Sequence, residues 1–146
     1  MAQIDDQIDL PTSVGYLLKE ASSTLRATME RALRPLGMTV THYSCLELLA
    51  QRPGLTNSEL ARGTFVTRQS MNVLLHALER DGYVTRAVDA ASGRSIPTSL
   101  TAFGEAERAK ASAAVRAVES RMTSSLTEDE RTLAFDLLSR MTAALN

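Results

Sequence analysis

Apolar residues recur at spacings of three and four along most of this chain, which is the period of an α-helix that buries one face. The clearest stripe runs from Val14 to Leu33 for about five turns, and Pro35 and Gly37 then end the helix. The spacing predicts six helices in all. They cover residues 14–33, 39–51, 58–62, 67–81, 102–124 and 131–145.

Polar residues at the predicted helix starts fit hydrogen-bonded caps. Thr56 with Glu59, and Thr127 with Glu130, fit the capping box, in which the hydroxyl accepts a backbone N–H and the carboxylate reaches back. Thr67 is placed to cap the helix that follows it. Residues 63–66 then read as the turn between two helices.

The period changes after the fourth helix. Residues 83–88 are rich in β-branched side chains and partly alternate, and residues 95–100 can return as a second strand. Residues 89–94 between them have the composition of a turn. Pro97 has no N–H group, so the second strand should lie at an edge or be irregular there. The segment is therefore predicted to form a β-hairpin.

The order of these elements predicts the fold class. A short capped helix, a tight turn and an amphipathic helix are typical of a helix-turn-helix, and a hairpin directly after them would be a wing. The apolar stripes of the outer helices exceed what one small winged module needs. We therefore expect a mainly α protein with a small β-hairpin wing, a winged helix-turn-helix that dimerises through its N- and C-terminal helices.

Composition narrows the class further. The chain has 146 residues, of which 44% are apolar, enough for one domain with a core. Its apolar runs are far shorter than the roughly 20 residues that cross a bilayer, and its acidic N-terminus lacks the apolar segment of a secretory signal. These features predict a cytoplasmic protein with no membrane partner.

Positive charge is concentrated in one part of the chain. The net charge is −1, but residues 52–94 hold six arginines and four acidic residues, a local excess of two positive charges. A local basic face is sufficient for a nucleic-acid partner, so the near-neutral total does not exclude one.

Several stretches resemble, in order and spacing, the MarR family of winged helix-turn-helix regulators. They are Gly54–Ala61, Val66–Ser70, Leu78–Arg86, the wing positions Asp89 and Gly93-Arg94, and the Leu100–Gly104 entry to the next helix. The resemblance covers roughly residues 14–145. It implies a dimeric transcription regulator without a cofactor, often a repressor that a small phenolic or lipophilic ligand releases from DNA.

The resemblance also implies a division of the single subunit, residues 1–146. Residues of about 36–101 would form the DNA-binding lobe, and residues of about 12–34 and 102–146 would form the dimerisation helices. Two recognition helices would then enter successive major grooves of a pseudo-palindromic operator.

The predicted DNA-reading surface follows from the fourth helix. If Met71, Leu74, Leu75 and Leu78 face the core, the opposite side faces outward. The predicted DNA contacts are Thr56, Ser58, Thr67, Arg68, Gln69, Ser70, Asn72, Val73, His76, Arg86 and Arg94. The alternative is a merely solvated face.

These side chains suit different parts of DNA. Gln69 and Asn72 can each hydrogen-bond an adenine edge, and Val73 can touch a thymine methyl group. Arg68 and Ser70 suit phosphates, or Arg68 a guanine. Thr56 and Ser58 lie at a helix start, where backbone N–H groups favour a phosphate.

The wing is expected to carry Arg94. The proteins that this chain resembles carry an arginine at the tip of the wing. The resemblance implies that this arginine enters the minor groove or pairs with the wing aspartate, here Asp89. The alternative is a salt bridge that only shapes the turn. Ala91 stands where the family often has another basic residue, so a shallow salt dependence is expected. Arg86 either contacts the DNA backbone or is a solvated strand residue.

The resemblance implies an effector site between the dimerisation helices and the DNA-binding lobe. Candidate residues are Tyr16, Lys19, His42, Tyr43 and Leu46, because a cation and aromatic faces can hold an aromatic carboxylate such as salicylate. The alternative makes Tyr43 and Leu46 ordinary core residues and Lys19 an exposed lysine.

Other classes fit less well. Cys45 lies among leucines without an adjacent basic residue, which favours a core position over a redox sensor. One cysteine and two histidines make a zinc site within one chain unlikely. Neither His42 nor His76 lies in a catalytic signature, and no Gly-rich phosphate loop is present, so an enzyme is not expected. The remaining alternative is a winged-helix protein–protein adaptor.

Overall fold

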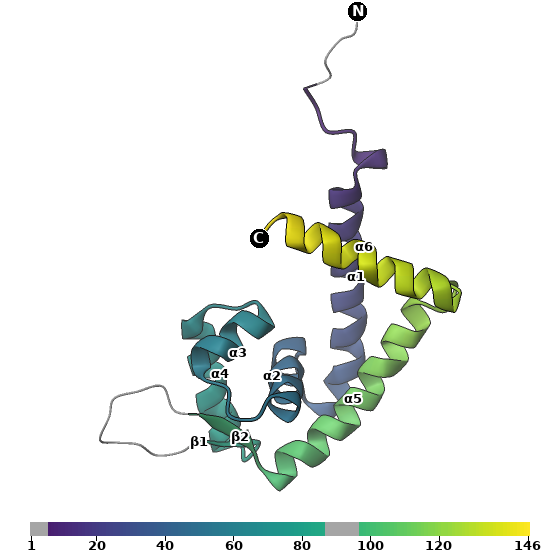
Figure 1. The fold of residues 1–146 in the computed structure, drawn as a ribbon. Helices are drawn as coiled ribbons and strands as arrows, with labels where there is room; N and C mark the ends of the chain where they lie inside the picture. Colours follow the sequence, from purple (N-terminus) through teal and green to yellow (C-terminus); the bar gives the residue numbers. More distant parts are fainter. Residues whose placement is uncertain (1–5, 87–96) are drawn as a thin grey trace, which may run out of the picture.

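The structure is a computed structural model that describes residues 6–86 and 97–146. Figure 1 shows a small lobe on one side and long helices on the other. The elements in chain order are the 3₁₀ turn Leu10–Thr12, α1 (Val14–Leu33), the 3₁₀ turn Arg34–Leu36, α2 (Val40–Gln51), α3 (Asn57–Thr64), α4 (Arg68–Arg80), β1 (Val84–Arg86), β2 (Thr98–Leu100), α5 (Ala102–Met122) and α6 (Glu128–Ala144). The predicted mainly α fold with a hairpin is confirmed.

The helix starts follow the predicted caps. Both capping boxes are present, at Thr56 with Glu59 and at Thr127 with Glu130. The Thr67 hydroxyl accepts a hydrogen bond from the backbone N–H of Ser70 at 3.0 Å. Short-range polar contacts therefore set where α3, α4 and α6 begin.

The predicted turn at residues 63–66 begins too early, because α3 continues to Thr64. The Thr64 hydroxyl donates to the carbonyl of Leu60 at 2.7 Å, within the helix. Gly63 is small because α2 packs there: a Cβ would come within 2.6 Å of Leu48 Cδ1. The glycine therefore serves helix packing, and Phe65 makes the turn.

The other differences lie at element ends. Within the described residues the strands cover Val84–Arg86 and Thr98–Leu100, so Tyr83 and Pro97 lie outside them, and residues 87–96 of the predicted hairpin lie outside the described part of the chain. The helix α5 ends at Met122, and α6 begins at Glu128, earlier than residue 131. The capping box and the acidic first turn belong to α6 itself.

The hairpin is antiparallel, with Val84 opposite Leu100 and Arg86 opposite Thr98. Val84 and Thr98 are buried. The backbone N–H of Thr98 also donates to the carbonyl of Leu55 at 3.2 Å, so β2 is tied to the segment before α3. Pro97 is exposed and lies just outside β2, which agrees with the irregularity predicted there.

The core of the lobe collects apolar side chains from α2, α3, α4 and the hairpin. Those with at most 2% exposure include Cys45, Leu46, Leu49, Leu60, Met71, Leu75, Leu78 and Val84. The predicted core position of Cys45 is confirmed, and its burial raises the pKa of the thiol to about 12. The thiol is therefore protonated at neutral pH.

The start of α5 is fixed on the hairpin. Thr101 donates from its backbone N–H to the carbonyl of Tyr83 at 3.1 Å, and its hydroxyl donates to the carbonyl of Gly82. That hydroxyl also accepts from the backbone N–H of Gly104 at 2.9 Å. The helix and the strand thus approach closely, and a Cβ on Gly104 would overlap the Tyr83 carbonyl oxygen.

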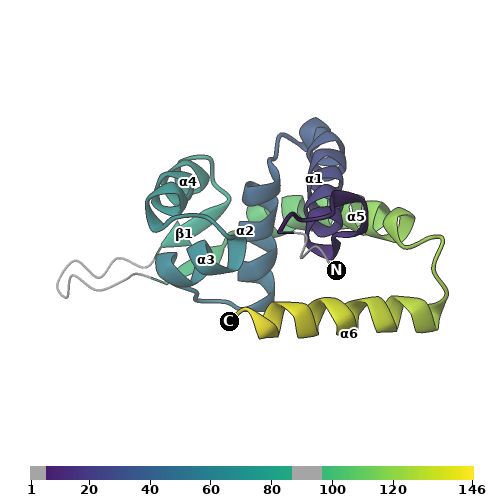
Figure 2. The same ribbon diagram turned by 90° about the horizontal axis from the view of Figure 1, so that it is seen from above.

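Beyond the lobe, α5 runs alongside α1, while α6 stands apart from both (Figure 2). No residue of α6 is buried. Large apolar side chains on it and at its C-cap are exposed: Leu133, Phe135, Leu137, Leu138, Met141 and the C-cap Leu145. At the other end of the chain, Val14, Leu17 and Leu18 of α1 are also exposed. Within the described residues, no helix is long and apolar enough to cross a membrane.

Candidate nucleic-acid interface

The orientation of α4 matches the prediction. Met71, Leu75 and Leu78 are buried, and Leu74 is half-buried against the same core. The four side chains expected on the opposite side are all exposed: Gln69, Asn72, Val73 and His76. The helix thus presents amide, imidazole and isopropyl groups to the outside, and Val73 keeps 66% of its surface exposed. Amide and apolar groups of this kind are those that read base edges in a major groove.

At the start of α4, Thr67 and Ser70 bond to each other. The Thr67 hydroxyl caps the helix and lies 3.0 Å from the Ser70 hydroxyl. Both residues are exposed. Their side chains are therefore held at the helix end where an incoming phosphate would meet free N–H groups.

The starts of α3 and α4 lie next to each other. Arg68 reaches from α4 to α3, and its guanidinium donates to the Ser58 hydroxyl at 3.4 Å. A positive charge and a helix N-terminus therefore share one surface, and both attract a phosphate.

Thr56 is less free than predicted, because its side chain is used within the capping box. Its hydroxyl donates to the Glu59 carboxylate at 2.9 Å, and its backbone N–H donates to the same oxygen at 3.2 Å. These hydrogen bonds lower the pKa of Glu59 below its ordinary value. A carboxylate thus lies beside the predicted phosphate contact, which leaves Ser58 and Arg68 as the better placed pair.

Asn72 is held by a second amide. Asn57, the first residue of α3, donates from Nδ2 to Asn72 Oδ1 at 3.3 Å. This contact orients the Asn72 amide and leaves its own NH₂ group to donate outward. Asn57 was not among the predicted site residues, because nothing in the sequence pairs it with Asn72.

Arg86 is tied to the far end of α4. Its guanidinium donates to His76 Nδ1 at 3.3 Å and lies 3.8 Å from the Glu79 carboxylate. Because arginine only donates, this contact requires the His76 tautomer that leaves Nδ1 free to accept. Arg86 is thus partly neutralised, while His76 gains a fixed orientation. Arg94, Asp89 and Ala91 of the predicted wing lie outside the described residues.

The structure does not bring the five predicted effector residues together in one chain. Tyr16 and Lys19 are exposed near the start of α1, whereas His42, Tyr43 and Leu46 lie on α2 within the lobe. Leu46 has no exposed surface, and Tyr43 is 7% exposed. These two residues form core, as the alternative interpretation had them.

His42 on α2 has a buried ring nitrogen without a hydrogen-bond partner. Its ring packs edge-on against Tyr83 at 4.6 Å, and its buried Nε2 makes no hydrogen bond. Burial lowers the pKa of His42 despite the opposing effect of Asp81. The ring is therefore neutral at pH 7.

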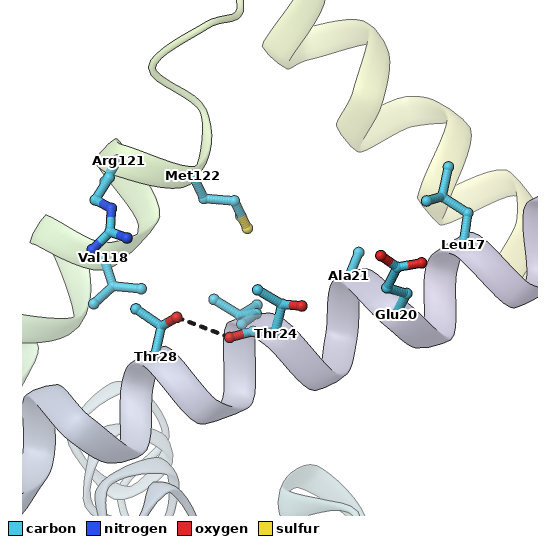
Figure 3. A pocket seen from close by; sticks show the side chains of 9 residues that line it. Leu17, Glu20, Ala21, Thr24, Thr28, Val118, Arg121 and Met122 are labelled. Carbon is cyan, nitrogen blue, oxygen red and sulfur yellow. Dashed lines mark hydrogen bonds between the residues drawn. The ribbon is translucent and has the colours of Figure 1, made fainter.

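A cavity of about 310 Å³ opens between α1 and α5 (Figure 3). Its lining is mostly apolar, with one cation and one anion. The lining residues are Leu17, Glu20, Ala21, Thr24, Leu25, Thr28, Val118, Arg121 and Met122. None of them was among the predicted effector residues, because the sequence does not show which faces of α1 and α5 leave a space.

A polar network joins the lobe to α5. Glu47 of α2 accepts hydrogen bonds from Tyr43 at 2.9 Å, Ser112 at 2.9 Å and Arg108 at 2.8 Å. Arg108 also donates to Glu105 through two contacts of 2.7 and 2.8 Å. Burial raises the pKa of Tyr43 to about 12, together with its hydrogen bond to Glu47. Sequence reasoning missed this network, because more than 60 residues separate Glu47 from Arg108.

Comparison with known proteins now adds to this geometry. The sequence model of the MarR family matches residues 36–95. The HTH-type transcriptional repressor Rv2887 of Mycobacterium tuberculosis is 44% identical over 118 residues, which are 81% of this chain and 85% of that protein. The chain belongs to the MarR family.

Solved structures of that MarR-family relative resemble the whole subunit. The Mycobacterium tuberculosis Rv2887 complex with salicylic acid matches with a TM-score of 0.73 and 40% identity, covering 95% of this chain and 99% of that one. The complex of the same protein with DNA matches with a TM-score of 0.74 and 38% identity, covering 89% and 98%. The winged helix-turn-helix predicted from the sequence is therefore the fold of this chain, and its class is that of a transcriptional regulator.

Proposed function

We propose that this chain is a homodimeric repressor that binds a pseudo-palindromic DNA operator and releases it when a small aromatic or lipophilic ligand binds. The observation that carries the DNA-binding part is the exposed outer face of α4, where Gln69, Asn72 and Val73 point away from the core. A relative 38% identical in sequence was solved in complex with DNA. In this proposal the protein recognises DNA and catalyses no reaction. The proposal keeps the cytoplasmic location that the sequence predicts for the protein.

The DNA contacts divide into two kinds. Ser58, Thr67, Arg68 and Ser70 lie at the adjoining starts of α3 and α4 and would hold phosphates. Gln69, Asn72, Val73 and His76 would face base edges. Arg86 and Arg94 would contact the backbone or the minor groove from the hairpin. Thr56 would contribute less than Ser58, because its hydroxyl and its backbone N–H both donate to the Glu59 carboxylate.

Dimerisation would use the exposed apolar helices. Residues of about 12–34 and 102–146 carry apolar side chains that the subunit itself does not cover. Covering them with a second copy removes apolar surface from water, which is the main driving force of stable association. Residues of about 36–101 would then form one DNA-binding lobe in each subunit.

The effector is proposed to be an aromatic carboxylate, because the similar Rv2887 was solved with salicylic acid. We consider two places on α1 and α5 where a cation lies next to apolar surface. One is Arg121 in the cavity between α1 and α5, whose volume fits a small aromatic ligand. The other is Lys19 with Tyr16, on the exposed side of α1.

The first experiment measures fluorescence anisotropy on the DNA upstream of the gene, against scrambled DNA at equal salt, with and without salicylate. We expect tight binding to the upstream DNA alone and weaker binding with salicylate. Arg121→Met and Lys19→Met then separate the two effector positions, since only the correct one abolishes the salicylate response. Equally weak binding to both DNAs, followed by a genome-wide selection that finds no operator, would favour the protein–protein adaptor.

The double variant Gln69→Ala/Asn72→Ala tests the base-reading role. We expect a loss of at least about 30-fold in affinity for the operator, because two base contacts of about 1–3 kcal/mol each are removed. Binding to scrambled DNA should change little, since phosphate contacts remain. An equal loss on both DNAs would contradict the assignment.

A further inference from the structure

Phe65 stands out in the turn between α3 and α4. Its backbone has φ 61° and ψ 36°, and among residues 6–86 and 97–146 it is the only non-glycine residue with a positive φ. Glycine adopts this conformation without a steric penalty, whereas a side chain with a Cβ does not. A phenylalanine here thus carries a local energetic cost that glycine would avoid.

The fold does not recover that cost through packing. The side chain of Phe65 is 94% exposed. Phe103, another exposed phenylalanine, at least packs against Tyr83 at 5.1 Å. A fully exposed aromatic ring in a strained position is better explained by a contact outside the subunit than by stability.

The backbone that carries the Phe65 ring is fixed by hydrogen bonds. The backbone N–H of Phe65 donates to the carbonyl of Arg62 at 3.3 Å, and that of Val66 donates to the carbonyl of Ala61 at 3.0 Å. Thr67, two residues further on, is the N-cap of α4. Two residues span at most about 7 Å of chain, so the ring lies beside the start of the recognition helix.

The charges around the ring indicate the kind of partner. Arg62 precedes Phe65 by three residues and Arg68 follows it by three, and both are exposed. The exposed residues from 65 to 70 include no carboxylate. A turn that carries an exposed ring and has an arginine three residues to either side in the sequence suits a polyanion with apolar groups more than a purely apolar protein surface.

We infer that Phe65 is a further specificity residue, whose ring contacts a thymine methyl group of the operator at the edge of the major groove. Thymine is the base that offers an apolar group there, and phenylalanine is among the side chains that contact it. This inference rests on the proposed DNA-binding function. The thymine would differ from the one that Val73 touches, because Phe65 lies in the turn before α4 whereas Val73 lies inside the helix.

The test combines a protein change with a DNA change. Phe65→Gly removes the ring and suits the left-handed backbone, so we expect the Tm to rise by about 3 °C while operator affinity falls about tenfold. Replacing single thymidines of the operator by deoxyuridine removes one methyl group at a time. One such change should weaken binding of the unaltered protein about tenfold and leave Phe65→Gly unaffected, which shows the coupling directly.

Val73→Ala is the matched control, and its coupled thymidine should lie elsewhere in the half-site. Unchanged operator affinity of Phe65→Gly would overturn the inference. So would a loss of affinity without a coupled thymidine, or an equal loss on scrambled DNA. A change in oligomeric state without a change in DNA binding would assign Phe65 to a protein contact instead. If the unaltered protein binds no operator, the proposed function itself fails.

Discussion

At the scale of single residues, two glycines on different helices show why the same residue type has different roles. Gly104 lies where α5 meets the hairpin, and a Cβ would overlap the backbone oxygen of Tyr83. Backbone cannot move aside as a flexible side chain can. Gly15 on α1 has only Ser13 Oγ near its added Cβ, at 3.9 Å. The close approach of two backbone segments therefore requires glycine at position 104, whereas position 15 has room for a side chain.

Gly104→Ala is expected to lower the free energy of unfolding by about 1–3 kcal/mol, as overpacking typically does. Urea unfolding followed by circular dichroism measures the change. Gly15→Ala provides the comparison, and it should be neutral or slightly stabilising because alanine favours helix more than glycine does. Equal stability of Gly104→Ala and the unaltered protein would mean that α5 can shift away from the hairpin without cost.

At the scale of the elements, the Glu47 network holds α2 against α5. Burial alone would favour the protonated form of Glu47, but hydrogen bonds from Tyr43, Ser112 and Arg108 outweigh it and lower the pKa of this carboxyl below 4.5. A carboxyl whose pKa is lower in the folded state stabilises the fold above its unfolded pKa. That stabilisation is lost as the pH falls through the folded value.

Glu47→Gln is therefore expected to lower the Tm at pH 7, because Arg108 loses its charged partner on α2. The difference from the unaltered protein should shrink as the pH falls below about 4.5, where Glu47 itself becomes protonated. Thermal melts across this range measure the gap. Glu119→Gln, at an exposed position of α5, is the matched control and should show no such convergence. A Tm difference that stays constant with pH would show that Glu47→Gln destabilises the protein for steric rather than electrostatic reasons.

The elements also show what the sequence allows to be predicted. Caps such as Thr127 with Glu130 depend on neighbours three residues apart, so the caps of α3, α4 and α6 were predictable, although the last helix was expected from residue 131 and begins at Glu128. The outward face of α4 followed from one periodicity. Contacts between distant segments, such as Asn57 with Asn72 or Glu47 with Arg108, leave no local signal. The role of Gly63 was misread because a glycine between two helices suggests a turn, while the contact with Leu48 that requires it is tertiary.

At the scale of the whole molecule, α6 has the composition of a packed helix but no cover. Asp136 and Ser139 lie on one side, and Leu138 and Met141 lie on the other. An amphipathic helix of this kind gains stability only when its apolar side is covered. In the proposed dimer the second subunit provides that cover.

Leu138→Glu/Met141→Glu is expected to yield monomers at micromolar concentration, as sedimentation equilibrium would measure. Operator affinity should fall by at least about 100-fold, because two half-sites are then bound independently rather than together. Ser139→Glu adds a charge on the polar side of the same helix and should leave both properties unchanged. A stable dimer in the double variant would place the interface elsewhere.

The fixed start of α5 has a mechanical consequence. Hydrogen bonds from the backbone N–H and the hydroxyl of Thr101 to the carbonyls of Tyr83 and Gly82 tie the start of the helix to the segment directly before β1. The 21 residues of the helix then extend as one rod of about 30 Å. The attached end of this rod lies next to the segment that follows α4, the recognition helix. A tilt of about 5° corresponds to nearly 3 Å of travel at the far end, which is about half a helical turn. A small displacement of α5 where the helices of two subunits meet would therefore rotate the lobe that carries α4.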